Sequence, residues 1–305
     1  MTRRRLLLIT SALFYFSGVA GAAGTASGAF LKLGIGARNV AMGETGAAES
    51  GIYSLYWNPA GLSNIETVTV SFMHAMWLDG ITFQQAAYAQ RMEPCAVGIS
   101  ATYLSMPAID KYDRTGVKQN STYTPTDMAL AFSLARNFET VPVGATIKFI
   151  SSSIDDKTAM AVAADVGACY DIAYSGAEKK IRLGLAVQNI GTPMKFETES
   201  FPLPLNVKLG AACSASDHTV IALDLNKAVD SDVTAHVGAE YALQLGGSSS
   251  LAGRLGYKTN ARWSEGLTGI TAGIGISINR LGLDYAFVPY GDLDTTHRIS
   301  ISLGF

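Results

Sequence analysis

The sequence predicts an all-β protein: an antiparallel β-barrel of about fourteen strands that crosses a membrane. Strict alternation at the chain end, an apolar composition without apolar runs, and unequal connection lengths support this prediction. In the last ten residues, Ile299, Ile301, Leu303 and Phe305 fall on one face of an extended strand and polar or small residues on the other. Lipid contacts one face of a barrel strand while water or protein contacts the other, so the pattern is typical of membrane barrels.

The composition of the 305-residue chain supports this fold class. Charged residues make up 16% of the chain, against roughly 25% in soluble domains. No window of about 20 apolar residues follows the N-terminal region, although each spanning helix needs one, so a helical membrane protein is excluded. The net charge of -2 gives no broad attraction for nucleic acid.

The first 22 residues have the features of a signal peptide. Arg3, Arg4 and Arg5 precede an apolar stretch at 6–16, and Ala20-Gly21-Ala22 forms a cleavage site. The alternative is a single anchoring helix, but the apolar stretch is short for one. We therefore expect export and a mature chain that begins near residue 23.

Fourteen segments from Glu66 to the end have strand character, and most have the 9–11 residues that a tilted membrane strand needs. They are 66–75, 81–90, 95–105, 126–136, 143–152, 160–172, 181–189, 203–213, 217–226, 234–244, 249–258, 268–278, 280–288 and 296–305. In 217–226, for example, Ile221, Leu223 and Leu225 alternate with Ala222 and Asp224. A soluble β-sandwich also alternates, but its strands are shorter, roughly 5–6 residues.

Connection lengths provide a second test of the barrel. If the first strand runs outward from the periplasm, the connections at its far end are longer on average than the turns at its near end. Outer-membrane barrels have this asymmetry, and an even strand number returns the C-terminus to the periplasm. The turn at 173–180 is long for its side.

Three short sequence motifs in the N-terminal region support a family resemblance. They are Phe30–Arg38, Ala41–Glu44 and Tyr56–Leu62, and Gln188–Thr192, Leu281–Phe287 and Thr296–Ser300 agree with them in the C-terminal half. These motifs resemble the PorV/PorQ family of bacterial outer-membrane proteins, within the FadL-like barrel group. The likeness covers essentially the whole mature chain.

The resemblance implies an outer-membrane barrel at 66–305 closed by an N-terminal plug, or hatch, at 23–65. FadL-like members pass hydrophobic compounds through the outer membrane, whereas PorV members serve type IX secretion and receive secreted proteins with C-terminal signals. The first hypothesis is passive transport of hydrophobic compounds, and the alternative is a protein-binding role in type IX secretion. The expected partners are therefore membrane lipid and either hydrophobic small molecules or secreted proteins. The outer loops are short for a hydrophobic capture groove, and the sequence leaves the oligomeric state open.

Within the plug, Asn58, Pro59 and Gly61 are the candidate hatch residues. Pro59 fixes its own φ and keeps Asn58 out of a helix, Asn58 can bond its own backbone, and Gly61 has unusual backbone freedom. A turn here would direct the chain into the first strand. The segment either moves to admit a ligand or stays in place as a static filling.

The alternation assigns ten charged side chains to the lumen, because facing lipid would cost an Arg or Lys about 2–4 kcal/mol at the midplane. They are Asp127, Lys148, Asp165, Arg182, Lys208, Asp224, Glu240, Arg254, Asp284 and Arg298. Both signs occur in near balance, which predicts an internal network around the plug or a polar channel without ion selectivity.

Aromatic residues near the outer strand ends predict an interfacial girdle. They are Trp77, Tyr103, Tyr123, Tyr257, Trp263, Phe287 and Tyr290. The four histidines are scattered without metal-ligand spacing, the three cysteines cannot all pair, and the sequence lacks nucleophile-elbow and phosphate-loop motifs. We therefore expect no catalytic residues, no metal and no cofactor.

Overall fold

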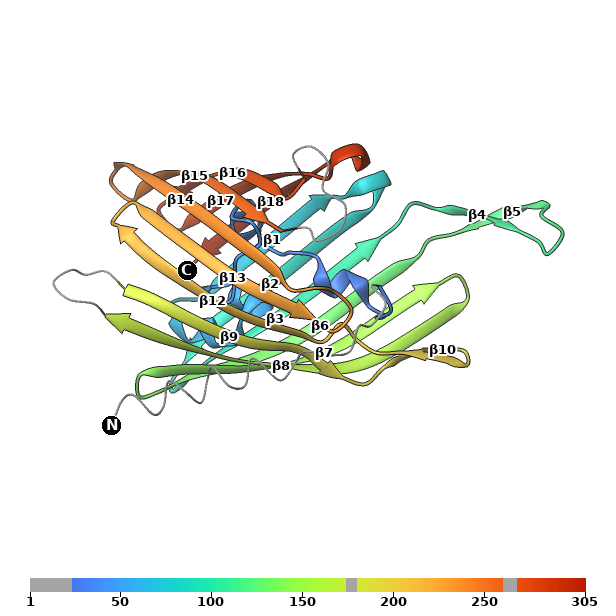
Figure 1. Cartoon of the computed structure of the whole chain (residues 1–305), viewed down its shortest axis with the longest axis horizontal. Coiled ribbons are helices and arrows are strands. Elements are labelled where there is room, and N and C mark those ends of the chain that lie inside the picture. The colour runs from blue at the N-terminus through green and yellow to red at the C-terminus, as the bar shows by residue number, and fades with distance from the viewer. Residues whose placement is uncertain (1–23, 174–179, 260–267) are drawn as a thin grey trace.

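The computed structural model describes residues 24–173, 180–259 and 268–305. Fourteen antiparallel strands close into a barrel, in which β1 pairs with both β2 and β18 (Figure 1). The barrel strands are β1 (Thr69–Met76), β2 (Thr82–Met92), β3 (Cys95–Ser105), β6 (Thr126–Phe138), β7 (Val141–Ile154), β8 (Lys157–Ala173), β9 (Lys180–Gly191), β12 (Asn206–Ser216), β13 (Thr219–Ala228), β14 (Thr234–Gly246), β15 (Ser249–Lys258), β16 (Ile270–Ile278), β17 (Leu281–Pro289) and β18 (Thr295–Gly304). The fourteen predicted strands are confirmed.

The two faces of the wall differ as the alternation predicts. In β13, Ile221, Leu223 and Leu225 are exposed on the outside, whereas Ala222 and Asp224 between them are buried. Outward charges such as Arg136 and Lys227 lie within two residues of a strand end. The outer surface is therefore an apolar belt of the kind that a membrane requires.

The two ends of the barrel are unequal. At the inner end, where β1 begins and β18 ends, short turns join the strands, such as those at 93–94, 139–140 and 247–248. At the outer end, the hairpin of β4 (Ile109–Tyr112) and β5 (Lys118–Tyr123) projects well beyond the wall (Figure 1). A second outer hairpin consists of β10 (Met194–Phe196) and β11 (Glu199–Phe201). This confirms the predicted asymmetry; the turn expected at 173–180 lies largely outside the described residues.

Residues 29–65, called the plug below, fold inside the barrel as short helical turns (Figure 1). These are η2 (Ala29–Lys32), α2 (Ala37–Ala41), α3 (Ser54–Trp57) and η3 (Pro59–Asn64). Just before the plug, Ser27 donates a backbone hydrogen bond of 2.9 Å to Pro202 in an outer connection, and after it the chain enters β1 at the inner end. The plug therefore runs from the outer end to the inner end. No helix among the described residues is long and apolar enough to cross a membrane.

Apolar side chains of the plug fill one side of the lumen. Trp57 and Leu62 are fully buried and belong to a cluster that includes Phe83 and Ile150 of the wall. Trp57 also donates an indole hydrogen bond of 2.9 Å to the Ile35 carbonyl, which satisfies its buried polar group.

The predicted aromatic girdle needs a correction at Trp77 and Tyr290. Their rings meet edge to face at 5.2 Å between centroids, and the buried Arg298 guanidinium lies 4.8 Å from the Trp77 ring centroid. Both side chains therefore belong to the outer mouth of the lumen rather than to the lipid interface. They follow the last residues of their strands, where the two-residue period no longer fixes direction. Trp263 and residues 1–22 of the predicted signal peptide lie outside the described residues.

Candidate functional site

The contact between plug and wall is the candidate site, and hydrogen bonds from wall side chains hold much of the plug backbone. The Asp224 carboxylate accepts from the backbone N–H groups of Gly46 and Ala47, both at 2.7 Å. The Thr271 hydroxyl accepts from the Gly43 N–H at 2.9 Å and donates to the Ala41 carbonyl. The wall thus provides partners for backbone groups that short helical turns leave unsatisfied.

More wall side chains continue this pattern around the barrel. Ser300 accepts from the Ala37 N–H at 2.8 Å, and the Gln188 amide donates to the Tyr56 carbonyl at 2.5 Å. Together with Asp224 and Thr271, these contacts come from β9, β13, β16 and β18. The plug is therefore held from several directions across the lumen.

Glycines in the wall allow the plug backbone to approach closely. A Cβ on Gly184 would collide with the Ala47 carbonyl, and one on Gly144 would collide with the backbone of Pro59. Gly238 and Gly256 meet the plug backbone in the same way, whereas Gly167 meets the Asn58 side chain. A side chain at any of these inward positions would push the plug away from the wall.

A partly buried ion network joins α2 to β14, β15 and β17. The Arg38 guanidinium bonds the Glu240 carboxylate at 2.9 and 3.0 Å and the Glu49 carboxylate at 3.1 and 3.2 Å. Arg254 bonds the same Glu240 at 2.5 Å and Asp284 at 2.7 Å. Two guanidinium groups thus share three carboxylates, so that each carboxylate has a guanidinium partner.

A second charged group lies toward the outer mouth. The Lys258 ammonium is 2.7 Å from the Glu44 carboxylate and 5.6 Å from the Tyr290 ring centroid. Burial alone would raise the pKa of Glu44, but the positive charges of Lys258 and Arg298 outweigh it and hold that pKa at about 2. Glu44 is therefore ionised at neutral pH and attaches the plug to β15.

The three candidate hatch residues are buried at the junction of α3 and η3. Asn58 is extended with φ −157°, its side-chain oxygen accepts from the Ala60 N–H at 3.1 Å, and its amide donates to the Ala47 carbonyl at 2.6 Å. Pro59 begins η3. Gly61 acts through space rather than through an unusual φ, since a Cβ there would collide with the Glu49 carbonyl.

The charges assigned to the lumen lie as follows. Buried are Lys148, Asp165, Lys208, Asp224, Arg254, Asp284 and Arg298, whereas Asp127, Arg182 and Glu240 are half-buried. Lys148 pairs with Asp165 at 2.8 Å, and the Lys208 ammonium lies 4.6 Å from the Trp57 ring centroid. Arg298 is fully buried, and its Nε and Nη2 atoms lack a hydrogen-bond partner.

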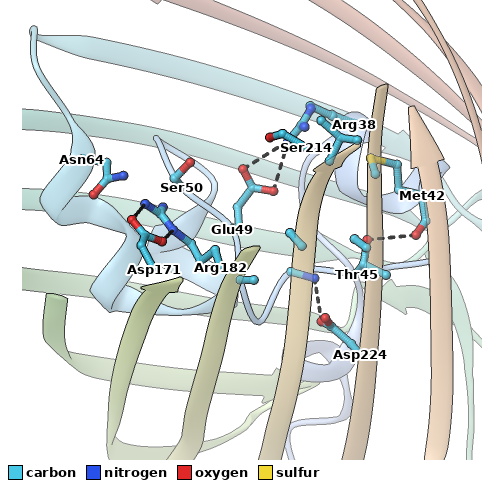
Figure 2. A pocket seen from close by; sticks show the side chains of 15 residues that line it. Arg38, Met42, Thr45, Glu49, Ser50, Asn64, Asp171, Arg182, Ser214 and Asp224 are labelled. Atoms are coloured by element: carbon cyan, nitrogen blue, oxygen red, sulfur yellow. Dashed lines mark hydrogen bonds and ion pairs between the residues drawn. The ribbon is translucent and has the colours of Figure 1, made fainter. Parts of the chain in front are cut away.

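A cavity of 350 Å³ separates plug residues 45–50 from the wall near the inner end. Figure 2 shows Glu49 directed toward Arg38, and Asp171 directed toward Arg182. Arg182 bonds Asp171 at 2.7 and 2.8 Å. Because charged and polar groups line this space, the cavity suits water better than a hydrocarbon. Among the described residues, no group of three His, Cys, Asp or Glu is arranged to hold a metal ion.

Sequence reasoning missed the charged residues of the plug and one of their partners in the wall. Arg38, Glu44 and Glu49 lie in a segment without alternation, so their direction had no sequence signal. The direction of Lys258 could have been predicted from the sequence. It follows the inward Arg254 by four residues in the same strand, and residues an even number of positions apart share a face.

Comparison with known proteins identifies the family. The model of the family described as type IX secretion system protein PorV matches residues 20–252. The chain belongs to the PorV family. No curated protein sequence matches it. Membership agrees with the resemblance predicted from the N-terminal motifs and places this barrel in the bacterial outer membrane.

Solved structures share the fold of this PorV-family barrel. The Ralstonia pickettii toluene transporter TbuX has a TM-score of 0.61 at 14% identity, over 89% of this chain and 98% of that one. The Pseudomonas putida toluene transporter TodX scores 0.58 at 11% identity, over 88% and 96%. A Pseudomonas aeruginosa FadL homologue scores 0.53 at 10% identity, over 88% and 98%. At these identities, the likeness concerns the fold alone.

Proposed function

We propose that this PorV-family barrel serves type IX secretion by binding other proteins, while its plug keeps the lumen closed. The observation that carries the proposal is the attachment of the plug to many wall strands. Backbone hydrogen bonds, the Arg38 ion network and the Glu44–Lys258 pair all hold it. Releasing the plug would break these contacts together and leave buried charges without partners.

The polar cavity also favours protein binding over hydrocarbon passage. A hydrocarbon beside Glu49, Arg38 and Arg182 would displace water from charged groups and replace it with nothing that bonds them. The β4–β5 hairpin, which projects from the outer end of the barrel, provides a surface that another protein could contact. Tyr112 and Val117 on this hairpin are 60% exposed.

A genetic experiment tests the secretion proposal. Deleting the gene in its host should retain type IX cargo in the periplasm, and the wild-type gene should restore its release. A variant in which a short turn replaces 109–123 should fold, as judged by heat-modifiable gel mobility, yet restore release poorly. Normal cargo release in the deletion strain would contradict the proposal.

Passive uptake of hydrophobic compounds stays a prediction with a test of its own. Vesicles that contain the wild-type barrel should take up toluene no faster than empty vesicles. Vesicles with a variant lacking 24–65 should take it up faster, because removal of the plug opens the lumen. Rapid uptake by the wild-type barrel would favour transport over secretion.

A further inference from the structure

The outward face of β14 to β17 contains a groove of 640 Å³. Tyr241, Leu255, Tyr285 and Phe287 form its sides, and Gly253 and Ala272 form its floor. All six lie at outward positions of their strands, in the apolar belt. The groove therefore faces the membrane rather than the lumen.

Strand register explains why the belt is hollow here. Gly253 is paired between Tyr241 of β14 and Ile274 of β16. Ala272 is paired between Leu255 of β15 and Phe287 of β17. Each small residue thus lies between two large ones, and a Cβ on Gly253 would meet no other atom within 4 Å.

The polar groups near the groove already have partners. The Tyr285 hydroxyl is 2.7 Å from Nδ1 of His297, and their rings stack at 6.0 Å between centroids. The guanidinium of Arg254 points into the lumen toward Glu240 and Asp284. What the groove offers a ligand is therefore apolar surface and aromatic ring faces.

We propose that this groove binds one acyl chain of an outer-membrane lipid. It is continuous with the belt that hydrocarbon already surrounds, so the membrane itself supplies the occupant. Its volume lies within the roughly 300–1,000 Å³ of pockets that enclose small hydrophobic ligands. Large side chains on both sides of a flat floor give an acyl chain more van der Waals contact than the convex wall elsewhere.

The groove also lies directly behind the plug. Gly273 lies between Ala272 and Ile274 in β16, and a Cβ built on it would contact the Ala41 side chain of α2. Only the backbone of the wall separates the bound chain from α2 at this point. Occupation of the groove therefore supports the part of the wall to which Arg38 is attached.

Photolabelling tests the proposal with the full-length barrel in phosphatidylethanolamine vesicles. A fraction of the lipid carries a diazirine in the middle of one acyl chain, and labelled peptides are mapped by mass spectrometry. Labelling of Tyr241, Leu255 and Phe287 should exceed that of Ile147 and Phe149, outward residues of β7, by at least threefold. Gly253→Leu should abolish this excess, whereas Ala101→Leu, outward on β3, should leave it unchanged.

Three results would overturn the proposal. Equal labelling around the belt would mean that the groove holds no preferred chain. Excess labelling that survives both Gly253→Leu and Ala272→Leu would place the site elsewhere. A disulfide between two copies of a Gly253→Cys variant in the vesicles would show that protein covers the groove. Heat-modifiable gel mobility shows whether each variant folds. If Gly253→Leu does not fold, Ala272→Leu alone provides the test of a filled groove.

Discussion

At single positions of the wall, the lack of a side chain is what lets the plug approach. Gly184 and Gly210 lie on neighbouring strands, and both meet Ala47 of the plug. Asp224, which pairs with Gly210 across β12 and β13, bonds the Ala47 N–H. At this point of the lumen, the two glycines leave room for Ala47, and the neighbouring Asp224 carboxylate accepts a hydrogen bond from its backbone.

Gly184→Ala should destabilise the barrel by about 1–3 kcal/mol, the usual cost of forcing an extra methyl group into a packed site. The added Cβ would collide with the Ala47 carbonyl. Thermal unfolding in detergent, followed by gel mobility, measures the loss. Gly253→Ala is the matched control, because its new methyl group enters open space. An equal loss in both variants would contradict the close approach of the plug.

Acid should weaken the attachment of Glu44. Because its pKa is lowered from 4.5 to about 2 in the folded protein, its stabilising effect is complete above pH 4.5 and disappears as the pH falls toward 2. The unfolding midpoint of the wild type should therefore fall more steeply between pH 4.5 and 2 than that of Glu44→Gln. Parallel curves for the two proteins would show that the Lys258 pair contributes nothing.

Alternation predicts the direction of a wall charge but not its partner. It predicts that Arg254 and Asp284 face the lumen, and both side chains are buried in the structure. Their mutual contact depends on the register of β15, β16 and β17, which bring residues 30 positions apart together. The Arg38–Glu240 pair, 202 positions apart, depends further on how the plug lies in the barrel. No periodicity in the sequence encodes that.

At the scale of elements, the long strands could be predicted and the plug helices could not. A strand of ten residues repeats its pattern five times, whereas α3 and α2 have only four and five residues. The sequence motif Gln188–Thr192 supports the family resemblance, but it does not predict the local backbone conformation. In the structure, Asn189 has φ +61° at an irregularity in the pairing of β8 with β9. The resulting bulge turns both Gln188 and Asn189 inward.

Because the plug runs from the outer end of the barrel to the inner end, only its first residues should be accessible from the cell surface. In a background without the three native cysteines, Ala29→Cys should react with a membrane-impermeant maleimide added to intact cells, because it is exposed at the outer end. Ser50→Cys, exposed beside the inner cavity, should react only after the outer membrane is permeabilised. Labelling of Ser50→Cys alone in intact cells would reverse the orientation of the barrel.

For the whole molecule, the central question is whether the plug must move. Hydrogen bonds, glycine contacts and ion pairs from several wall strands hold the plug in place. Breaking only some of these contacts would therefore not free the plug to leave the lumen. A barrel that works through its outer surfaces needs no such release, whereas a barrel that conducts through its lumen does. Locking the plug separates the two modes of action.

Asn58→Cys provides the lock, since the Asn58 amide nitrogen lies 3.4 Å from the sulfur of the native Cys169 in β8. Disulfides usually join residues whose Cβ atoms are about 3.5–4.5 Å apart, and oxidation of the variant should join plug and wall in this way. We expect cargo release by cells expressing this variant to be the same before and after oxidation. The double variant Asn58→Cys with Cys169→Ala controls for oxidation alone. Loss of release only in the disulfide-bonded protein would mean that secretion requires plug movement.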